Sequence, residues 1–248
     1  MDDNELLERI AGGRTDHVFD LLRRPNREAL LTGGTIRPLQ WFVYYNDTTA
    51  LKAVLEAEGR LPGISLDEEL GHAAFFGHWK VCDFLLAQGA NPRHAKADSG
   101  ETPLHSALSK AGRPYYFYVV RLLVERGADV TARTVPGAET GAFMRDVRCK
   151  GETPLHRAAA YADAETIEYL LANGADPSAR DAAGDSPLSW ASFHLRPGNI
   201  LGLLCFGEHR IGPRGQAQIT SDHGCGWGNG MERKLLGDYL PESEARSS

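Results

Sequence analysis

Two histidines are the side chains that most readily suggest chemistry, because each sits in a nearly identical segment. His105 lies in GETPLHSALS at residues 100–109, and His156 lies in GETPLHRAAA at residues 151–160. An imidazole can serve as a general acid or base near neutral pH. Neither segment supplies a nucleophile with a matching base, so we assign no reaction to these histidines. The duplication itself indicates a repeated structural element.

A second set of chemically capable side chains lies near the C-terminus. Cys205, His209, His223 and Cys225 include the ligand types that zinc prefers. A glycine and a predicted helix end separate Cys205 from His209, and the spacing of His223 and Cys225 is too tight for a standard zinc finger. We therefore predict no metal site. The four cysteines show no CxxC spacing, which favours reduced thiols.

The elements that must position these residues are repeated, because the similarity extends beyond the two motifs. A looser copy, GDSPLSWASF, follows at 184–193. The segment TIEYLLANGADP at 166–177 aligns without a gap with VCDFLLAQGANP at 81–92. Each copy carries a leucine pair and then a glycine, as expected where a helix ends in the left-handed conformation that glycine adopts at low cost. The pattern predicts a recurring helical element that ends at a glycine.

The motif Thr-Pro-Leu-His, followed two positions later by alanine, resembles the ankyrin repeat, a β-turn plus two antiparallel helices in about 33 residues. The resemblance implies an all-α repeat solenoid in which helix-turn-helix repeats stack and β-hairpin fingers link them. It also implies that the motif threonine and histidine form hydrogen bonds between adjacent repeats and are structural. The motif positions in this sequence are Thr102, Pro103, Leu104, His105, Thr153, Pro154, Leu155 and His156.

Six repeats are predicted, beginning near residues 4, 35, 66, 100, 151 and 184, in a solenoid that spans 1–211. The first two are degenerate, and the first has the polar outer face that a terminal repeat needs. Gln40, Gly71 and Ser189 replace the motif histidine in the second, third and sixth repeats, so apolar packing or other polar contacts must hold those junctions. For 212–248 we predict an irregular Gly-rich C-terminal cap, made of a loop, a short capping helix and a polar tail.

An insertion lengthens the fourth repeat. The fourth and fifth repeats start 51 residues apart, whereas the fifth and sixth start 33 apart. We place the extra residues in SKAGRPYYFYVV, between two helices, and in an enlarged finger at 131–150. Long loops tend to be functional or disordered. We predict a basic finger that contacts a partner and can be deleted over 136–145 without loss of stability; a floppy solvated loop is the alternative. Its predicted contact residues are Arg133, Phe143, Met144, Arg145 and Arg148.

Aromatic residues are concentrated in two places. YYFYVVRLL puts four in succession at 115–118, and a helix cannot turn all four inward. Others crowd the second and third repeats. Two interpretations stay open: the rings fill gaps in a degenerate solenoid, or they form a binding face, since Tyr and Trp dominate binding hot spots. For the second interpretation the predicted partner-binding residues are Tyr115, Tyr116 and Trp41.

Composition limits the classes of function. With 33 acidic against 27 basic residues, the chain lacks the basic stripe that nucleic-acid binding requires. No run of about 18 apolar residues occurs, and the N-terminal MDDNELLERI is acidic where a signal peptide is basic and then apolar. We expect a cytoplasmic protein that is monomeric alone and contacts neither nucleic acid nor membrane.

Together these patterns predict a non-enzymatic scaffold that binds another protein through the concave face of the solenoid and the enlarged finger, without a cofactor. The alternative is an enzyme or small-molecule-binding protein on the same scaffold, with a pocket between the finger at 134–150 and the loop at 221–230. In that pocket the acid–base groups would be His209, Asp222, His223 or Cys225, and the anion-binding groups would be Arg145 or Arg148.

Overall fold

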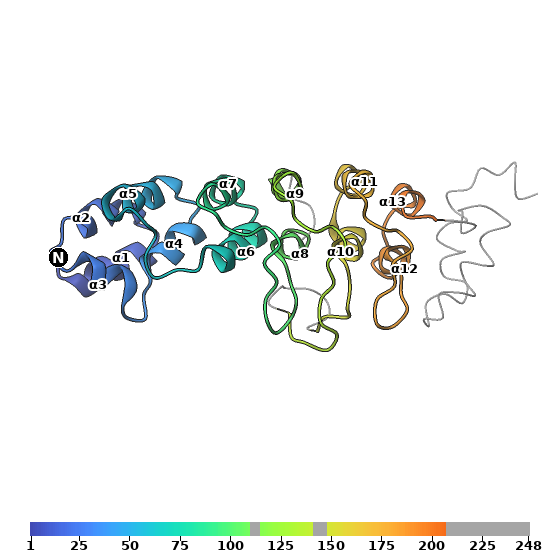
Figure 1. The fold of residues 1–248 in the computed structure, drawn as a ribbon, viewed down its shortest axis with the longest axis horizontal. Helices are drawn as coiled ribbons and strands as arrows, with labels where there is room; N and C mark the ends of the chain where they lie inside the picture. Colours follow the sequence, from blue (N-terminus) through green and yellow to red (C-terminus); the bar gives the residue numbers. More distant parts are fainter. Residues whose placement is uncertain (110–114, 141–147, 207–248) are drawn as a thin grey trace, which may run out of the picture. The chain divides into compact units, whose positions relative to one another are not determined.

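The fold is helical throughout the part of the chain that the structure describes. The structure is a computed structural model, and it describes residues 1–109, 115–140 and 148–206. Helices follow one another along the chain without an intervening sheet in those segments (Figure 1). They are α1 (Asp3–Ala11), a short 3-10 helix (Thr15–His17), α2 (Val18–Leu22), α3 (Arg27–Thr32), α4 (Pro38–Tyr44), α5 (Thr48–Glu58), α6 (Leu66–Phe76), α7 (Trp79–Ala87), α8 (Pro103–Ala107), α9 (Tyr115–Glu125), α10 (Pro154–Tyr161), α11 (Ala164–Ala172), α12 (Pro187–Phe193) and α13 (Gly198–Leu203).

The helices belong to two bodies, which we describe separately. The N-terminal body consists of Met1–His94, Thr102–Ala107 and Tyr118–Ala128. The C-terminal body consists of Ala95–Glu101, Leu108–Phe117 and Asp129–Ser248. The enlarged finger and the second copy of the Thr-Pro-Leu-His motif therefore both lie in the C-terminal body.

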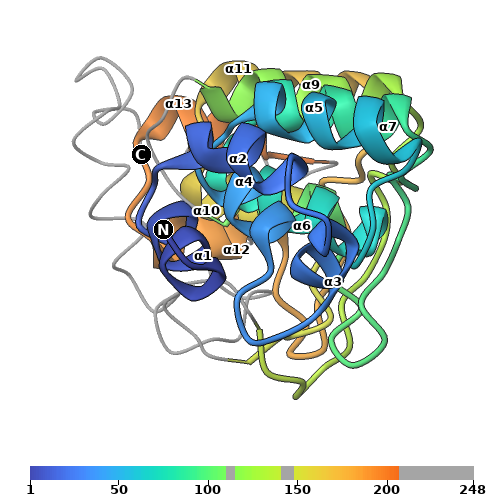
Figure 2. The same ribbon diagram turned by 90° about the vertical axis from the view of Figure 1, so that its left-hand side faces the viewer.

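The N-terminal body is built from helix pairs that stack in two rows. Helix α4 packs against α5 and α6, and α7 packs against α5 and α6. Helices α5 and α7 form one row and α4 and α6 the other (Figure 2). Leu39, Phe42, Leu51, Val54 and Leu70 are fully buried between the rows. Each such side chain contributes about 1.5–3 kcal/mol through the hydrophobic effect, so this packing dominates the stability of the body.

Local signals in the sequence start and end these helices. The Asp47 carboxylate accepts hydrogen bonds from the amides of Thr49 and Ala50 at the start of α5, at 2.9 Å each. The Asp163 carboxylate caps α11 in the same way through the Thr166 amide. Caps of this kind are worth about 1 kcal/mol. At the other end, Gly77 terminates α6 with a φ of 74°, a conformation that favours glycine.

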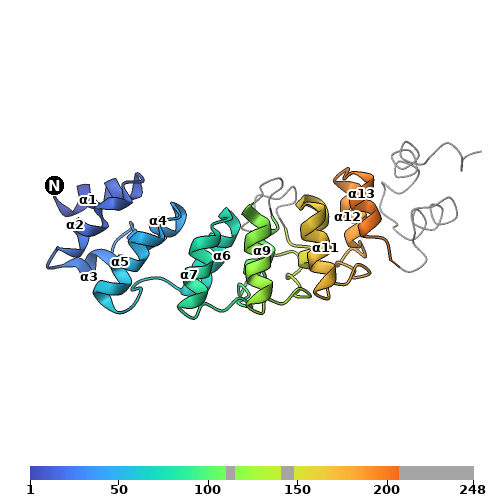
Figure 3. The same cartoon turned by 90° about the horizontal axis from the view of Figure 1, so that it is seen from above.

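The C-terminal body repeats the same arrangement with α10, α11, α12 and α13. Helix α10 packs against α11 and α12, and α13 packs against α11 and α12. Figure 3 shows α11 beside α13. The core includes Leu155, Ile167 and Leu170, all fully buried, whereas Leu171 is only partly buried. The two members of this leucine pair are therefore unequal, because adjacent helix positions point about 100° apart.

The described part of the enlarged finger, 134–140 and 148–152, pairs with itself through one isolated antiparallel bridge between Glu139 and Arg148. One detail of the expected architecture is wrong. The aromatic stretch that starts at Tyr115 belongs to α9 and not to the connection before it. Its buried residues explain this, because Tyr116, Val119, Val120 and Leu123 recur at helical spacing.

The predicted C-terminal cap at 212–248 lies outside the described residues, as does part of the predicted insertion, at 110–114 and 141–147. Within the described segments, every helix is too short or too polar to cross a membrane.

Candidate functional site

The motif histidines are held on both sides of the ring. The Nδ1 of His156 accepts hydrogen bonds from the Thr153 amide and hydroxyl, at 3.2 and 2.9 Å. Since Nδ1 accepts, Nε2 carries the proton and donates to the Asp185 carbonyl at 3.0 Å. Burial lowers the pKa of His156, which keeps the ring neutral. The ring is fully buried and joins the fifth repeat to the sixth, so its geometry is structural.

His105 makes the same contacts with its own threonine. Its Nδ1 lies 2.9 Å from the Thr102 hydroxyl and 3.3 Å from the Thr102 amide, and the ring is fully buried. A substrate could not reach either histidine without unfolding the motif. These contacts of His105 lie within its own repeat, whereas the His156 contact with the Asp185 carbonyl joins two repeats.

A different polar contact joins the second and third repeats, where the motif histidine is replaced. The Gln40 amide on α4 donates to the Glu69 carboxylate on α6 at 3.1 Å. The other Glu69 oxygen lies 3.2 Å from Nδ1 of His72. At the sixth repeat, Ser189 instead forms a local capping box with Ser186. The Gln40–Glu69 contact thus bridges α4 and α6 where the motif histidine is absent.

A groove of about 480 Å³ runs between α4 and α6, within the N-terminal body. Its walls come from one face of each helix, because positions 40, 41 and 44 on α4 and positions 69, 72 and 76 on α6 follow helical spacing. We call it the α4–α6 groove. Its lining residues are Thr35, Arg37, Gln40, Trp41, Val43, Tyr44, Glu69, His72 and Phe76.

Three aromatic rings form the apolar part of the α4–α6 groove. The ring centroids of Trp41 and Tyr44 are 5.5 Å apart at an interplanar angle of 80°, and those of Tyr44 and Phe76 are 5.1 Å apart at 82°. Edge-to-face pairs of this kind hold their rings in place. Tyr45 stacks on Trp41, and its hydroxyl donates to the Ala11 carbonyl at 2.8 Å, which braces the wall from behind. Tyr44 remains 46% exposed, so the wall is ordered and accessible.

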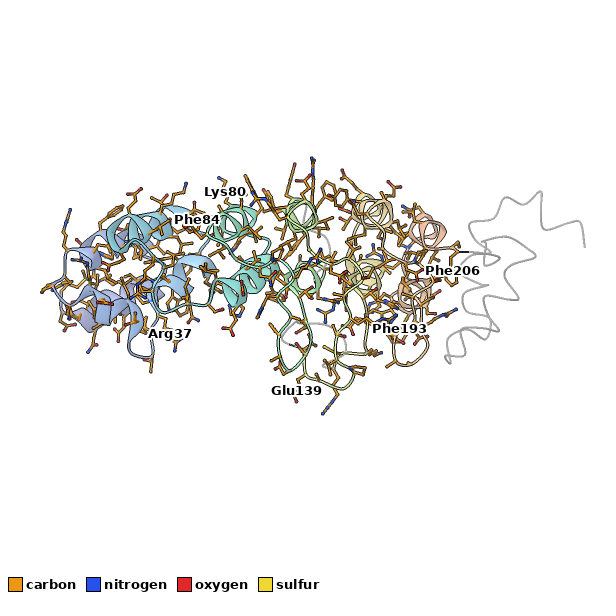
Figure 4. All side chains as sticks on the ribbon, in the orientation of Figure 1. Arg37, Lys80, Phe84, Glu139, Phe193 and Phe206 are labelled. Atoms are coloured by element: carbon orange, nitrogen blue, oxygen red, sulfur yellow. The ribbon has the colours of Figure 1, made fainter. Side chains whose placement is uncertain are left out.

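Charged groups lie at the base and the rim of the α4–α6 groove. Glu69 is 2% exposed, whereas the His72 side chain is 51% exposed. Arg37 is exposed and forms no ion pair with any residue in the described segments. In the N-terminal body Arg37 lies on the side opposite Lys80 of α7 (Figure 4). The groove thus combines a buried carboxylate, accessible rings and a free cation at one end.

A second cluster of charges lies in the C-terminal body and is fully buried. Arg157 on α10 forms ion pairs with Glu101 at 2.8 Å and Glu152 at 2.7 Å, and all three side chains are within 1% of complete burial. The Arg157 guanidinium also donates to the Ser109 hydroxyl at 3.0 Å. Neutralising two buried carboxylates with one guanidinium stabilises charges that would otherwise be very costly.

Two threonines tie the finger to this cluster. The Thr134 hydroxyl donates to Glu152 at 2.6 Å, and the Thr140 hydroxyl donates to Glu101 at 2.5 Å. The finger backbone closes on itself next to them, through the Gly137 amide to the Cys149 carbonyl and the Cys149 amide to the Ala138 carbonyl. Deletion of 136–145 would remove part of this base. From these contacts we now expect such a deletion to reduce stability, in place of the unchanged stability that the sequence predicted.

The pKa values of the cluster are set by opposing effects. Burial raises the pKa of Glu152, but the Arg157 guanidinium and the Thr134 hydroxyl outweigh it and bring the pKa down to about 2. Burial also raises the pKa of Glu101, but the Arg157 guanidinium and the Thr140 hydroxyl lower it more, so the pKa ends below its usual value. Burial and the two carboxylates raise the pKa of the Cys149 thiol to about 11. The carboxylates are therefore ionised structural groups, and the thiol is a poor nucleophile at neutral pH.

The finger and α9 residues predicted to contact a partner differ in their exposure and in their contacts. Arg133 is exposed but donates to the carbonyls of Gly151 and Arg180, which ties the finger to the next connection. Arg148 is exposed and donates to the Gly137 carbonyl at 2.9 Å. Tyr115 is 60% exposed. Tyr116 is only 7% exposed, so its assignment to a binding surface is wrong. Its helical position points it inward with the core residues of α9.

Several predicted residues cannot be placed. Phe143, Met144 and Arg145 of the finger lie outside the described residues, and so do His209, Asp222, His223 and Cys225. The alternative pocket between 134–150 and 221–230 therefore has no described geometry. Among the residues described, no group of three or more His, Cys, Asp or Glu side chains could hold a metal ion.

Sequence reasoning missed the polar residues of both clusters. Glu101 and Glu152 occupy the same place in the two motif copies, one residue before the threonine, and this was a usable signal. Arg157 follows only one of the two histidines, so no repeat pattern marked it. Glu69 and His72 lie in the third repeat, where Gly71 replaces the motif histidine, so comparison with the other repeats did not mark them.

Comparison with known proteins agrees with the helix-pair repeats. The family description "Ankyrin repeat" matches residues 150–182, and "Ankyrin repeats (3 copies)" matches residues 39–134. The chain is 36% identical over 104 residues to Rabankyrin-5 of Homo sapiens, an alignment that covers 42% of this chain and 8% of that protein. It is 32% identical over 119 residues to the human Ankyrin repeat domain-containing protein 63, covering 48% and 27%.

A third relative is the human NF-kappa-B inhibitor delta, 32% identical over 118 residues, covering 46% of this chain and 32% of that protein. The chain thus spans less than a third of the length of each of these curated relatives. The similarity is confined to the repeats.

Proposed function

Because this chain belongs to the ankyrin-repeat family, whose members generally act as non-enzymatic protein-interaction modules, we propose that it binds a partner protein through the α4–α6 groove. The observation that carries this proposal is the row of accessible rings from Trp41, Tyr44 and Phe76 beside polar side chains. Aromatic anchors in pockets supply most of the energy at protein interfaces. The groove lies between α4 and α6, the first helices of the second and third repeats, and we infer that this side of the repeats is the one presented to a partner.

The enlarged finger is proposed as a second contact. Its base is held by the buried cluster around Arg157, so a partner would meet a segment with a set position. Val135 and Glu139 at this finger are exposed, as is Arg148. Loops on a rigid base are the usual carriers of binding function.

The alternative of an enzyme or small-molecule site at 134–150 and 221–230 depends on residues outside the described segments, and no observation favours it. We further propose, as the sequence predicts, that the protein is cytoplasmic and that it is a monomer when no partner is bound.

The test is capture of partners by the full chain from a lysate of its native cells. Three baits are compared: the wild type, the double variant Trp41→Ala/Tyr44→Ala, and Trp79→Ala as a control. Trp79 is a 41% exposed ring of the same body, on α7 and outside the groove. Thermal unfolding of all three checks that they are folded.

We expect a partner that mass spectrometry finds with the wild type and the control but not with the double variant. The purified partner should then bind the double variant at least about 30-fold more weakly, because truncating a hot-spot side chain costs about 2 kcal/mol or more. Equal binding to all three baits would show that the groove is not the contact surface.

A further inference from the structure

The charge at the base of the α4–α6 groove is unlike the other buried glutamates of the described segments. Glu101 and Glu152 both pair with the permanent cation of Arg157. Glu69 is as deeply buried, at 2% exposure, yet its two partners are the Gln40 amide and the His72 imidazole. Neither of these partners carries the permanent charge that Arg157 supplies to the other two glutamates. Within the described segments, Glu69 forms no ion pair with an arginine or a lysine.

The surroundings of that charge suit a positive ligand group. A cation over the face of Trp, Tyr or Phe is attracted by the ring electrons, most strongly where it is shielded from water. Trp41, Tyr44 and Phe76 stand at angles of 80° and 82° to their neighbours, so their faces point in different directions around the groove. A carboxylate adds the charge-assisted hydrogen bond that such a group needs.

We propose that the α4–α6 groove takes up the cationic side chain of a partner, an arginine or a lysine, with the aliphatic stem against the rings and the charged head toward Glu69. The inference rests on the proposed protein-binding function and specifies its chemistry. The net charge of −6 on the whole chain favours approach of a basic segment over long range.

The two side chains that contact Glu69 are exposed to solvent. Gln40 is exposed and His72 is 51% exposed at its side chain, so either can turn away and free one oxygen of Glu69 for the ligand. Arg37 is the one group of the groove that opposes a cation. It sits before the start of α4, whereas the Gln40 contact to Glu69 is one turn further on. Removing Arg37 should therefore leave cation binding intact or strengthen it.

The test uses four blocked pentapeptides that differ only in the central residue: arginine, lysine, norleucine or glutamate. Norleucine matches the lysine stem without its charge. Each peptide is titrated into the isotope-labelled full chain, and the indole N–H signal of Trp41, assigned with Trp41→Phe, reports binding. We expect the arginine and lysine peptides to bind at least about tenfold more tightly than the other two.

Variants separate the charge from the rings. Glu69→Gln keeps the size of the side chain but replaces one acceptor oxygen with an amide donor and removes the charge, and should abolish the preference for lysine over norleucine. Trp41→Leu keeps an apolar wall without the aromatic face and should weaken the cationic peptides about three- to tenfold. Arg37→Ala is the matched control that must retain the preference. Thermal unfolding shows whether each variant is folded.

Three results would overturn the inference. If norleucine binds as tightly as lysine, the groove takes apolar side chains, and if Glu69→Gln keeps the preference for lysine, Glu69 does not recognise the charge. In both cases the proposed protein-binding function would still stand. If none of the four peptides shifts the Trp41 signal, the cationic occupant is wrong, and partner capture with the Trp41→Ala/Tyr44→Ala bait then decides the function separately.

Discussion

Replacing Arg157 with alanine should destabilise this protein more than any surface change. The side chain is completely buried and pairs with two buried carboxylates, Glu101 and Glu152. Arg157→Ala leaves both negative charges without a counterion, and also removes the donor to Ser109. Removing one partner of a buried ion pair typically costs about 3–5 kcal/mol. We expect a loss of that size in the free energy of unfolding at pH 7.

The matched control is an arginine in an exposed ion pair. The Arg126 guanidinium lies 2.7 Å from Asp83, a distance like that in the buried cluster, but the two side chains are 43% and 50% exposed. Exposed pairs contribute about 0–1 kcal/mol because water solvates both charges. Arg126→Ala should therefore cost at most about 1 kcal/mol. Because the two ion pairs have similar distances, the difference in the cost of unfolding measures the effect of burial.

The dependence on pH provides the sharper test. In the wild type the pKa of Glu152 is lowered from 4.5 to about 2, so its contribution to stability is present above pH 4.5 and is lost as the pH falls toward 2. Arg157→Ala removes the guanidinium, the largest influence that lowers the pKa of both carboxyl groups, while burial, which raises a carboxyl pKa, remains. They should take up protons at higher pH than in the wild type, and the gap between the two proteins should narrow as the pH is lowered from 7 to 4.

Urea unfolding followed by circular dichroism, at pH 7 and at pH 4, measures both quantities. A cost below about 1 kcal/mol at pH 7, equal to that of Arg126→Ala, would refute the assignment of Arg157 as the counterion of two buried acids. A gap that stays constant between the two pH values would refute the pKa argument, because the lost interaction would then not involve ionised carboxylates.

Three further substitutions test the packing, each by the free energy of unfolding. Gly100 has a φ of 67°, and a Cβ there would lie 3.1 Å from a finger carbonyl oxygen. Gly184 has a φ of 87°, but the space around it is open. Gly100→Ala should therefore cost at least about 1 kcal/mol more than Gly184→Ala. Leu195 is 57% exposed with a φ of 54°, so Leu195→Gly should stabilise the protein by about 0.5–1 kcal/mol, and a loss would show that its side chain packs more than its exposure indicates. Leu170→Ala should cost about 2–5 kcal/mol and Leu171→Ala clearly less, because only the first is fully buried; equal costs would contradict the packing of α11.

Much of the local structure was readable from the sequence. The resemblance of the motif to the ankyrin repeat implied a structural role for His156, and its contacts with the Thr153 hydroxyl and amide lie within one helical turn. Glycines after the leucine pairs predicted helix ends, and Gly89, Gly127 and Gly174 do have positive φ values. These features depend on neighbours a few residues apart, so the order of residue types is enough to specify them.

Whether each helical side chain points toward the core or toward solvent was harder to predict. Tyr115 and Tyr116 are adjacent, but one is 60% exposed and the other 7%, because α9 packs only one of its faces on the core. The sequence indicated that the aromatic run could not all turn inward, and could not choose which ring would.

Both candidate sites depend on stacking. The sequence determined the period of the repeats, the all-α class and the structural role of the motif histidines, since these follow from local geometry repeated along the chain. Only the tertiary structure placed Gln40 of one repeat on Glu69 of the next, and Glu101 and Glu152 on the two sides of Arg157. Such pairs form between residues whose distance is set by how repeats and their connecting loops pack, and no spacing in the chain encodes that distance.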